Sequence, residues 1–144
     1  MRSIFKVALV ICGVILVLAC ANPAQEHLEQ GSAYREQGRF DKAIAEYTKA
    51  IEADPNLALA YNNRGCVYSW KKDYERAIAD FNKAIELDPQ RATAYLNRAQ
   101  LYVGNAEEDK AIADLKKVLQ LSQDPSEIQM AEGLMEILRA SESN

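Results

Sequence analysis

One stretch of this 144-residue chain occurs twice at a fixed interval, and that repetition limits the folds open to it. The stretch AIAEYTKAIEADP begins at Ala43, and AIADFNKAIELDP begins 34 residues later at Ala77. A third and less similar copy, AIADLKKVLQLSQ, begins after the same interval at Ala111. A fixed period of this length is typical of stacked units that each bury one face against the next. We therefore expect a stack of three units rather than a single globular core.

Within each copy, the spacing of apolar and small residues predicts a pair of facing helices. The second unit carries such residues at i, i+4 and i+7 in two successive segments: Tyr61, Gly65, Tyr68 and then Ala77, Phe81, Ala84. This spacing places each set on one face of a helix. We expect the small residues Gly65 and Ala77 to let the two backbones approach closely. Pro89 should end the second helix, because the residue before a proline disfavours helical geometry.

The second unit, residues 58–91, reads ALAYNNRGCVYSWKKDYERAIADFNKAIELDPQR. It resembles the tetratricopeptide repeat (TPR), whose pattern is an aromatic residue, then Gly-x-x-Tyr, Ala-x-x-x-Phe and Pro. The resemblance implies an all-α solenoid of helix-turn-helix repeats. His27 takes the aromatic position of the first unit, which suits a terminal repeat. The third unit is degenerate, because Ala99 replaces the glycine, and we expect its turn at Gly104 and Asn105. The three repeats are expected at residues 24–57, 58–91 and 92–125.

Residues 126–140, SEIQMAEGLMEILRA, predict a further helix after the third repeat. Ser126 and Gln129 match a capping box, in which each side chain bonds the backbone N–H of the other residue. We expect the apolar face of this helix to cover the last repeat, because an array needs a capped end to stay soluble. A membrane or partner-binding role for that face is the alternative, and residues 141–144 form a tail. The apolar face consists of Ile128, Ala131, Leu134, Met135 and Leu138.

The first residues resemble an export signal. Basic Arg2 and Lys6 precede the apolar run VALVICGVILVLACA, residues 7–21. This run is shorter than the roughly 20 residues that span a bilayer. It could be cleaved within its last residues or retained as a short anchor. Both outcomes export the domain from the cytoplasm.

The run contains the sequence VLAC, which ends at Cys20 and resembles the bacterial lipobox. Residues 1–19 are then the signal peptide, and residues 20–23 are the lipidated N-terminus and a short linker. Ala21, rather than an aspartate, favours sorting to the outer membrane, facing the periplasm, if the host has two membranes. We therefore expect a lipid-anchored protein of the bacterial cell envelope. The alternative is cleavage after Ala21, which gives a secreted or periplasmic soluble protein.

Composition argues against nucleic-acid binding and against catalysis. The chain has 17 Lys and Arg residues against 21 Asp and Glu, so its net charge of −4 repels phosphate backbones. The acidic residues are expected on helix exteriors. Cys66 is left without a partner once the two cysteines of the first 21 residues are set aside, and His27 is the single histidine. No phosphate-binding loop, metal-ligand spacing or activated nucleophile is present in the sequence. We expect no enzyme activity, no cofactor and no metal.

The TPR resemblance implies a concave groove lined by the first helix of each repeat. Asparagine amides there can pair with the backbone of an extended peptide, while leucines and Trp70 bury apolar side chains. The alternative for Trp70 is packing between repeats. The candidate groove residues are Leu28, Leu59, Asn62, Asn63, Cys66, Ser69, Trp70, Leu96, Asn97 and Gln100.

Family members that grip acidic C-termini use Lys, Asn and Arg at five inner positions, which the resemblance places here at Leu28, Ser32, Asn63, Thr93 and Asn97. Only Asn63 fits that pattern, so no carboxylate clamp is expected. These features together predict a non-catalytic adaptor of the envelope that binds a protein or peptide partner. The alternative function is a groove for a small molecule or lipid.

Overall fold

The computed structural model describes residues 22–142, and over that range the chain forms seven α-helices and no strand. The predicted all-α solenoid of three hairpins and a C-terminal helix is confirmed. The signal peptide and Cys20 lie outside the described residues. The helices are α2 (Pro23–Glu36), α3 (Phe40–Ala53), α4 (Ala58–Trp70), α5 (Tyr74–Leu87), α6 (Ala92–Gly104), α7 (Glu108–Leu121) and α8 (Pro125–Glu142).

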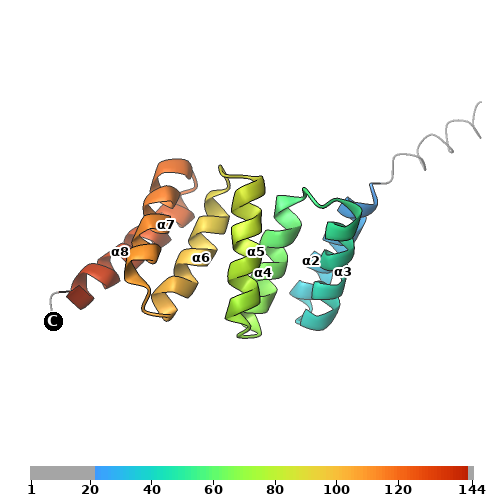
Figure 1. Cartoon of the computed structure of the whole chain (residues 1–144), viewed down its shortest axis with the longest axis horizontal. Coiled ribbons are helices and arrows are strands. Elements are labelled where there is room, and N and C mark those ends of the chain that lie inside the picture. Colours follow the sequence, from blue (N-terminus) through green and yellow to red (C-terminus); the bar gives the residue numbers. More distant parts are fainter. Residues whose placement is uncertain (1–21, 143–144) are drawn as a thin grey trace, which may run out of the picture.

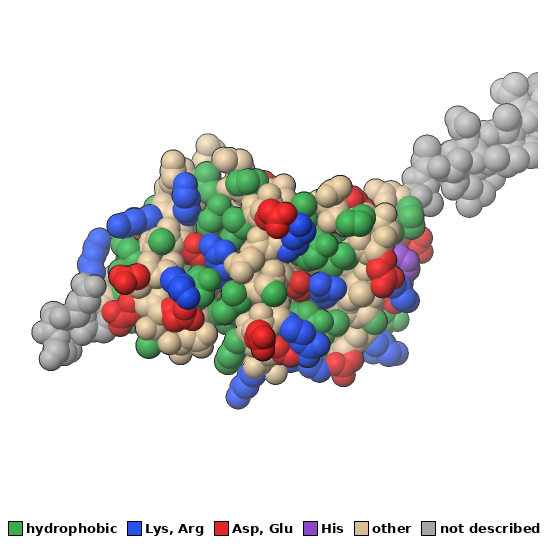
Figure 2. Space-filling view, viewed as in Figure 1, with side chains coloured by type: hydrophobic (Ala, Val, Ile, Leu, Met, Phe, Trp, Pro, Cys, Tyr) green, Lys and Arg blue, Asp and Glu red, His purple; other side chains and the backbone are tan. Residues whose placement is uncertain are grey.

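The hairpins α2–α3, α4–α5 and α6–α7 stand side by side in one row, and α8 closes the row (Figure 1). In the described chain α2, α4, α6 and α8 contact one another in turn, whereas α3, α5 and α7 do not. The first helix of each hairpin therefore belongs to the inner layer. Lys, Arg, Asp and Glu side chains are interspersed over the outer helices α3, α5 and α7 (Figure 2). None of the described helices is long and apolar enough to cross a membrane.

Glycines set the distance between the two helices of a hairpin. A Cβ built on Gly65 would lie 2.8 Å from Cε1 of Phe81 and 3.2 Å from the carbonyl oxygen of Ala77. A Cβ on Gly31 would lie 2.6 Å from the ring of Tyr47. These distances are too short for a side chain, so only glycine lets α2 meet α3 and α4 meet α5 this closely.

Each hairpin turn contains one residue with left-handed backbone geometry. These residues are Gly38 (φ 70°), Lys72 (φ 62°) and Ala106 (φ 56°), and they recur at the period of the repeat. The residue after each one donates its N–H to a carbonyl five residues back, as in a Schellman motif. The turn expected at Gly104 and Asn105 is therefore placed too early, because Gly104 is the last residue of α6 and the left-handed residue is Ala106.

Helix α8 covers the third repeat as the sequence predicts. Ala131 and Leu138 are buried in one cluster with Ala99, Leu115 and other residues of α6 and α7. The predicted capping box is wrong: Oδ1 of Asp124 accepts the N–H of Ser126 at 2.8 Å. Asp124 is thus the capping residue, and Pro125 takes the first helical position, where its missing N–H costs nothing.

The expectation that all acidic residues lie on helix exteriors is also wrong. Asp80 and Asp114 are 6% and 5% exposed, and each accepts two hydrogen bonds from an arginine of the preceding helix. Arg64 donates to Asp80 and also to Thr48 of the first repeat. These pairs compensate the buried charges and link the helices within a hairpin.

The first repeat replaces this pair with a different set of partners. Gln30 stands where the later repeats have arginine, and the buried Glu46 pairs with His27 and Lys49 instead. Nδ1 of His27 lies 2.7 Å from Oε2 of Glu46, and Nζ of Lys49 lies 2.8 Å from Oε1. The hydrogen bond from Lys49 is the main reason that the pKa of Glu46 is below its ordinary value. The single histidine is thus a hydrogen-bond partner of a buried carboxylate in the first repeat.

Candidate binding groove

The inner face of the second and third repeats contains a pocket of about 210 Å³ between α4 and α6. Its lining comes from α4 and α6, together with Phe81 of α5. The structure therefore brings together half of the ten predicted groove residues. The pocket is lined by Cys66, Ser69, Trp70, Phe81, Asn97 and Gln100.

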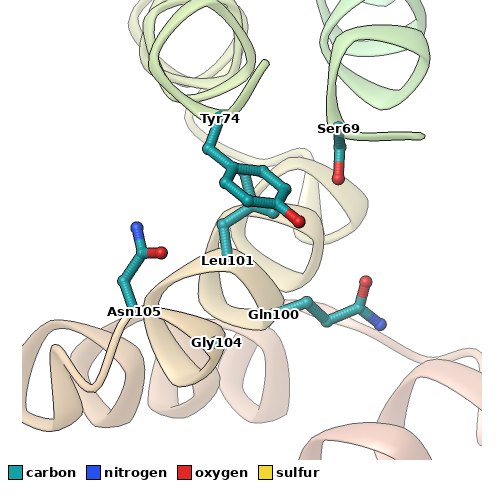
Figure 3. Close-up of a pocket in the computed structure, with 6 residues that line it drawn as sticks. All are labelled: Ser69, Tyr74, Gln100, Leu101, Gly104 and Asn105. Carbon is teal, nitrogen blue, oxygen red and sulfur yellow. The ribbon is translucent and has the colours of Figure 1, made fainter. Parts of the chain in front are cut away.

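A second pocket, also about 210 Å³, adjoins the first and shares Ser69 and Gln100 with it. The ring of Tyr74 lies over Leu101, with the side chains of Ser69 and Asn105 on either side (Figure 3). The two pockets together form a continuous depression that runs from Asn97 to the turn between α6 and α7. We call this depression the α4–α6 groove.

Two exposed aromatic residues flank the α4–α6 groove. Trp70 ends α4 and is 55% exposed, and Tyr74 begins α5 and is 41% exposed. The Trp70 ring also packs against Phe40 of the first repeat, with the ring centres 5.6 Å apart. Both interpretations of Trp70 thus hold in part: it contacts the neighbouring repeat and still presents more than half of its surface to solvent.

Amide side chains form a hydrogen-bonded network at the other end of the groove. Nδ2 of Asn97 donates to Oδ1 of Asn62 at 3.1 Å and to the sulfur of Cys66 at 3.2 Å. Nδ2 of Asn62 donates to Oδ1 of Asn63 at 3.4 Å. Both N–H groups of Asn97 are therefore used inside the protein. Oδ1 of Asn97 and Nδ2 of Asn63 have no partner among the described residues, which leaves an acceptor oxygen and an NH2 donor group for a ligand.

Cys66 lines the groove with a thiol that burial keeps in its neutral, less nucleophilic form. Burial raises the pKa of its thiol to about 11, so the thiol stays protonated at neutral pH. Within residues 22–142 there is no group of three or more His, Cys, Asp or Glu side chains that could hold a metal ion. The groove offers apolar contact and neutral hydrogen bonds, and these are properties of a binding surface.

Three segments of the sequence match profiles of one family. Residues 31–69 match a profile described as TPR repeat, and residues 58–91 and 81–113 each match one described as tetratricopeptide repeat. A solved domain, the second TPR of Spaghetti (RPAP3) bound to the HSP90 peptide SRMEEVD, is 30% identical over 69% of this chain and 93% of that domain, with a TM-score of 0.67. The chain belongs to the tetratricopeptide repeat family.

Other solved TPR domains are similar over more of the chain. The Arabidopsis OM64 TPR domain is 26% identical, covers 83% of this chain and 96% of its own, and has a TM-score of 0.76. The TPR2B domain of yeast Sti1, in its pHsp70 complex, is 27% identical, covers 85% of this chain and 98% of its own, and has a TM-score of 0.73. None of the curated proteins matches the sequence significantly.

Some predicted groove residues of this TPR protein are not accessible. Leu28 and Leu96 are 4% and 5% exposed and belong to the cores of the first and third repeats. They therefore present no apolar surface to a partner, contrary to the expectation from the sequence. Asn62 is 4% exposed and acts within the amide network, and Leu59 is half-buried against the first core. The residue that follows Leu96, Asn97, does line the groove.

None of the five clamp positions of this TPR protein carries a cation. Ser32 donates to the carbonyl of Leu28 and lies 3.2 Å from the hydroxyl of Tyr47. Thr93 donates to Glu127 of α8 at 2.7 Å. These side chains are engaged inside the protein. The charge of Arg35 acts on the Cys66 thiol and slightly opposes the rise in its pKa.

Sequence reasoning does not identify five of the groove residues: Tyr74, Phe81, Leu101, Gly104 and Asn105. The repeat pattern does not point to Tyr74, because this residue starts an outer helix, and the pattern assigns outer helices to the opposite layer. It does occupy the same repeat position as Phe40, one period earlier. Aromatic residues at the start of two successive outer helices are thus the signal that could have located this edge of the groove.

Proposed function

We propose that this TPR protein is a non-catalytic adaptor that binds an extended, uncharged segment of a partner protein in the α4–α6 groove. The observation that carries the proposal is the pair of adjoining pockets flanked by exposed Trp70 and Tyr74. Similar solved TPR domains are bound to peptides of HSP90 and to pHsp70, which supports a peptide as the ligand class.

The contacts available in the groove define the ligand. Oδ1 of Asn97 can accept a backbone N–H of the peptide, and the amide of Gln100 can donate to a backbone carbonyl. An apolar side chain of the peptide would lie between the rings of Trp70 and Tyr74. The pockets themselves offer no carboxylate or cation, so a charged ligand side chain would lose its hydration there without gaining a partner.

A peptide fits the groove better than a small molecule does. Pockets that enclose drug-sized ligands usually have volumes of about 300–1,000 Å³ and bury most of the ligand. Both pockets of the α4–α6 groove are open to solvent, so neither would bury most of such a ligand. An extended peptide that crosses both pockets makes enough contacts along its length to bind.

We further propose that the protein is a lipoprotein of the bacterial cell envelope, anchored through Cys20. Support comes from the apolar run and the VLAC sequence alone. Asn22 is the first described residue and its side chain caps α2, so the helical array begins almost directly after the anchor. Cys20→Ala should abolish labelling by fatty acid and leave unprocessed precursor. Normal processing of that variant would instead favour cleavage after Ala21.

The groove is tested by placing a photo-crosslinking amino acid at Gln100 in the full chain expressed in a bacterial host. The partner segment should be crosslinked at Gln100 and identified by mass spectrometry. The matched control carries the same amino acid at Lys83, on the outer face of α5. A partner crosslinked at Lys83 but not at Gln100 would assign binding to the outer face and contradict the proposal.

A further inference from the structure

The turn end of the first repeat contains a basic pocket that is not part of the α4–α6 groove. Its volume is about 390 Å³, and it shares no lining residue with the two pockets of the groove. Three cations and one carboxylate line it, so its local charge is +2, whereas the whole chain carries −4. The lining residues are Gly38, Arg39, Phe40, Asp41, Lys42 and Lys71.

The second and third repeats place an acidic residue immediately before their outer helix. Asp73 forms an ion pair with Arg76, and Glu107 forms one with Lys110. The backbone N–H of Arg76 also donates to Oδ1 of Asp73 at 3.3 Å. In both repeats a carboxylate of the chain itself therefore balances the cation in the first turn of the helix.

The first repeat has a cation in place of that acid. Arg39 stands one period before the acid of the second repeat, and Lys42 stands one period before its cation. The guanidinium of Arg39 lies 4.9 Å from the centre of the Tyr34 ring and the ammonium of Lys42 lies 5.6 Å from it, so both positive charges are held beside one side chain. Arg39 donates to the neutral side chain of Gln37. Neither cation forms an ion pair within the described residues.

The start of α3 adds hydrogen-bond donors to the pocket. No side chain caps this helix. The backbone N–H groups of Phe40, Asp41 and Lys42 lie in its first turn, where a helix offers no acceptor, and they have none among the described residues. Lys71 and Asp41 pair with each other. The uncompensated charge of the pocket is therefore that of Arg39 and Lys42.

We propose that this pocket binds a phosphate monoester group, either of a soluble compound or of a lipid headgroup. Such a group carries close to two negative charges at neutral pH, so it balances both cations, whereas one carboxylate would balance only one. Its oxygens can accept hydrogen bonds from a guanidinium, an ammonium and the backbone N–H groups at a helix start together. The inference goes beyond peptide binding in the α4–α6 groove and does not depend on it.

Titration of glycerol 3-phosphate against the ¹⁵N-labelled full chain in a nonionic detergent tests the site by NMR. The backbone amides of Phe40, Asp41 and Lys42 should shift and saturate, with half-saturation at about 1 mM because the cations are exposed. Sodium chloride of equal ionic strength should not reproduce these shifts. No saturable shift with glycerol 3-phosphate or with the lipid described next would overturn the inference.

Phosphatidic acid added to the detergent micelles is the second arm and distinguishes the two sources of the phosphate. Saturable shifts of the same amides with glycerol 3-phosphate alone would assign the site to a soluble compound. Shifts with phosphatidic acid alone would assign it to a lipid headgroup, and shifts in both arms would show that the site accepts the group from either source. Each of these three results supports a phosphate site.

Arg39→Asp tests the role of the unbalanced charge, because it restores the acid that the second repeat has at this position. It should weaken phosphate binding about tenfold or more. The variant should melt at the same temperature as the parent or higher, since the new carboxylate can cap α3 and pair with Lys42. Lys116→Asp makes the same change of charge at an exposed lysine of the third repeat and should bind like the parent. Parent-like binding by Arg39→Asp, or an equal loss in Lys116→Asp, would overturn the inference.

Discussion

The guanidinium of Arg98 donates to both carboxylate oxygens of Asp114, with each nitrogen–oxygen distance at 2.7 Å. The same guanidinium donates to Asn82 of the second repeat at 2.5 Å. One period earlier, Arg64 makes the equivalent contacts to Asp80 and Thr48. Each arginine therefore joins three helices of two adjacent repeats.

Removal of this carboxylate should destabilise the fold strongly. Asp114→Ala leaves the guanidinium of Arg98 largely buried without its counterion, and we expect a loss of about 3 kcal/mol in the free energy of unfolding. The matched control is Glu86→Ala, which removes the partner of Lys83 in an exposed ion pair and should cost far less. Urea denaturation of the full chain in detergent measures both. Equal losses would mean that the buried ion pair contributes no more to the free energy of unfolding than the exposed pair does.

The left-handed turn residues predict a stabilising substitution. Ala106→Gly should raise the free energy of unfolding by about 1 kcal/mol, because an L-residue with a side chain is disfavoured at this φ. Gly38→Ala, at the same position of the first repeat, should lower it by a similar amount. A Cβ on Gly38 meets no atom within 4 Å, so the effect would come from the backbone alone. Denaturant midpoints that move the same way in both variants would contradict this explanation.

Stability should fall in acid partly through Glu46. Its folded-state pKa lies below the ordinary 4.5, chiefly because of the hydrogen bond from Lys49 and with a smaller contribution from His27. The stabilisation from its carboxylate is therefore fully present above about pH 4.5 and is lost as the pH falls through the folded-state pKa. Glu46→Gln should lose less stability than the parent between pH 5 and about pH 3. Identical pH profiles of unfolding free energy would show that Glu46 does not contribute.

The absence of cations at the clamp positions predicts which peptides are rejected. The peptide SRMEEVD contains two glutamates and an aspartate, and it should not bind this chain measurably at about 1 mM. The second TPR domain of RPAP3 serves as the positive control in the same calorimetric titration. Micromolar binding of SRMEEVD to this chain would show that cations outside the five clamp positions can hold an acidic terminus.

The sequence predicts the fold well because residues that pack in the same way recur at the repeat period. Gly65 and Phe81 correspond to Gly31 and Tyr47 one period earlier, and the same close contact between a glycine and an aromatic ring occurs in both repeats. The buried Asp80 was missed because a single aspartate on a helix looks like a solvated residue. Its partner Arg64 is 16 residues away, and only the recurrence of both residues one period later marks them as a pair.

The groove was predicted less accurately, because the rotation of each inner helix decides which residues are exposed. Leu96 and Asn97 are adjacent in sequence, yet Leu96 is in the core and Asn97 lies in the groove. Helical periodicity places a residue only to within about one position of a face boundary. Tyr74 lines the groove although it belongs to the outer helix α5. A pattern that covers only the inner helices cannot include it.

Binding in the α4–α6 groove is tested most directly by titrating the segment crosslinked at Gln100, made as a synthetic peptide, against three forms of the full chain. The parent should bind in the micromolar range with little dependence on salt. Trp70→Ala combined with Gln100→Ala should weaken binding about 10- to 100-fold with an unchanged helical circular dichroism signal, because both side chains are exposed. Lys83→Glu combined with Glu86→Lys, on the outer face, should bind like the parent. If the outer pair abolishes binding and the groove pair does not, the partner uses the outer face and the groove assignment is wrong.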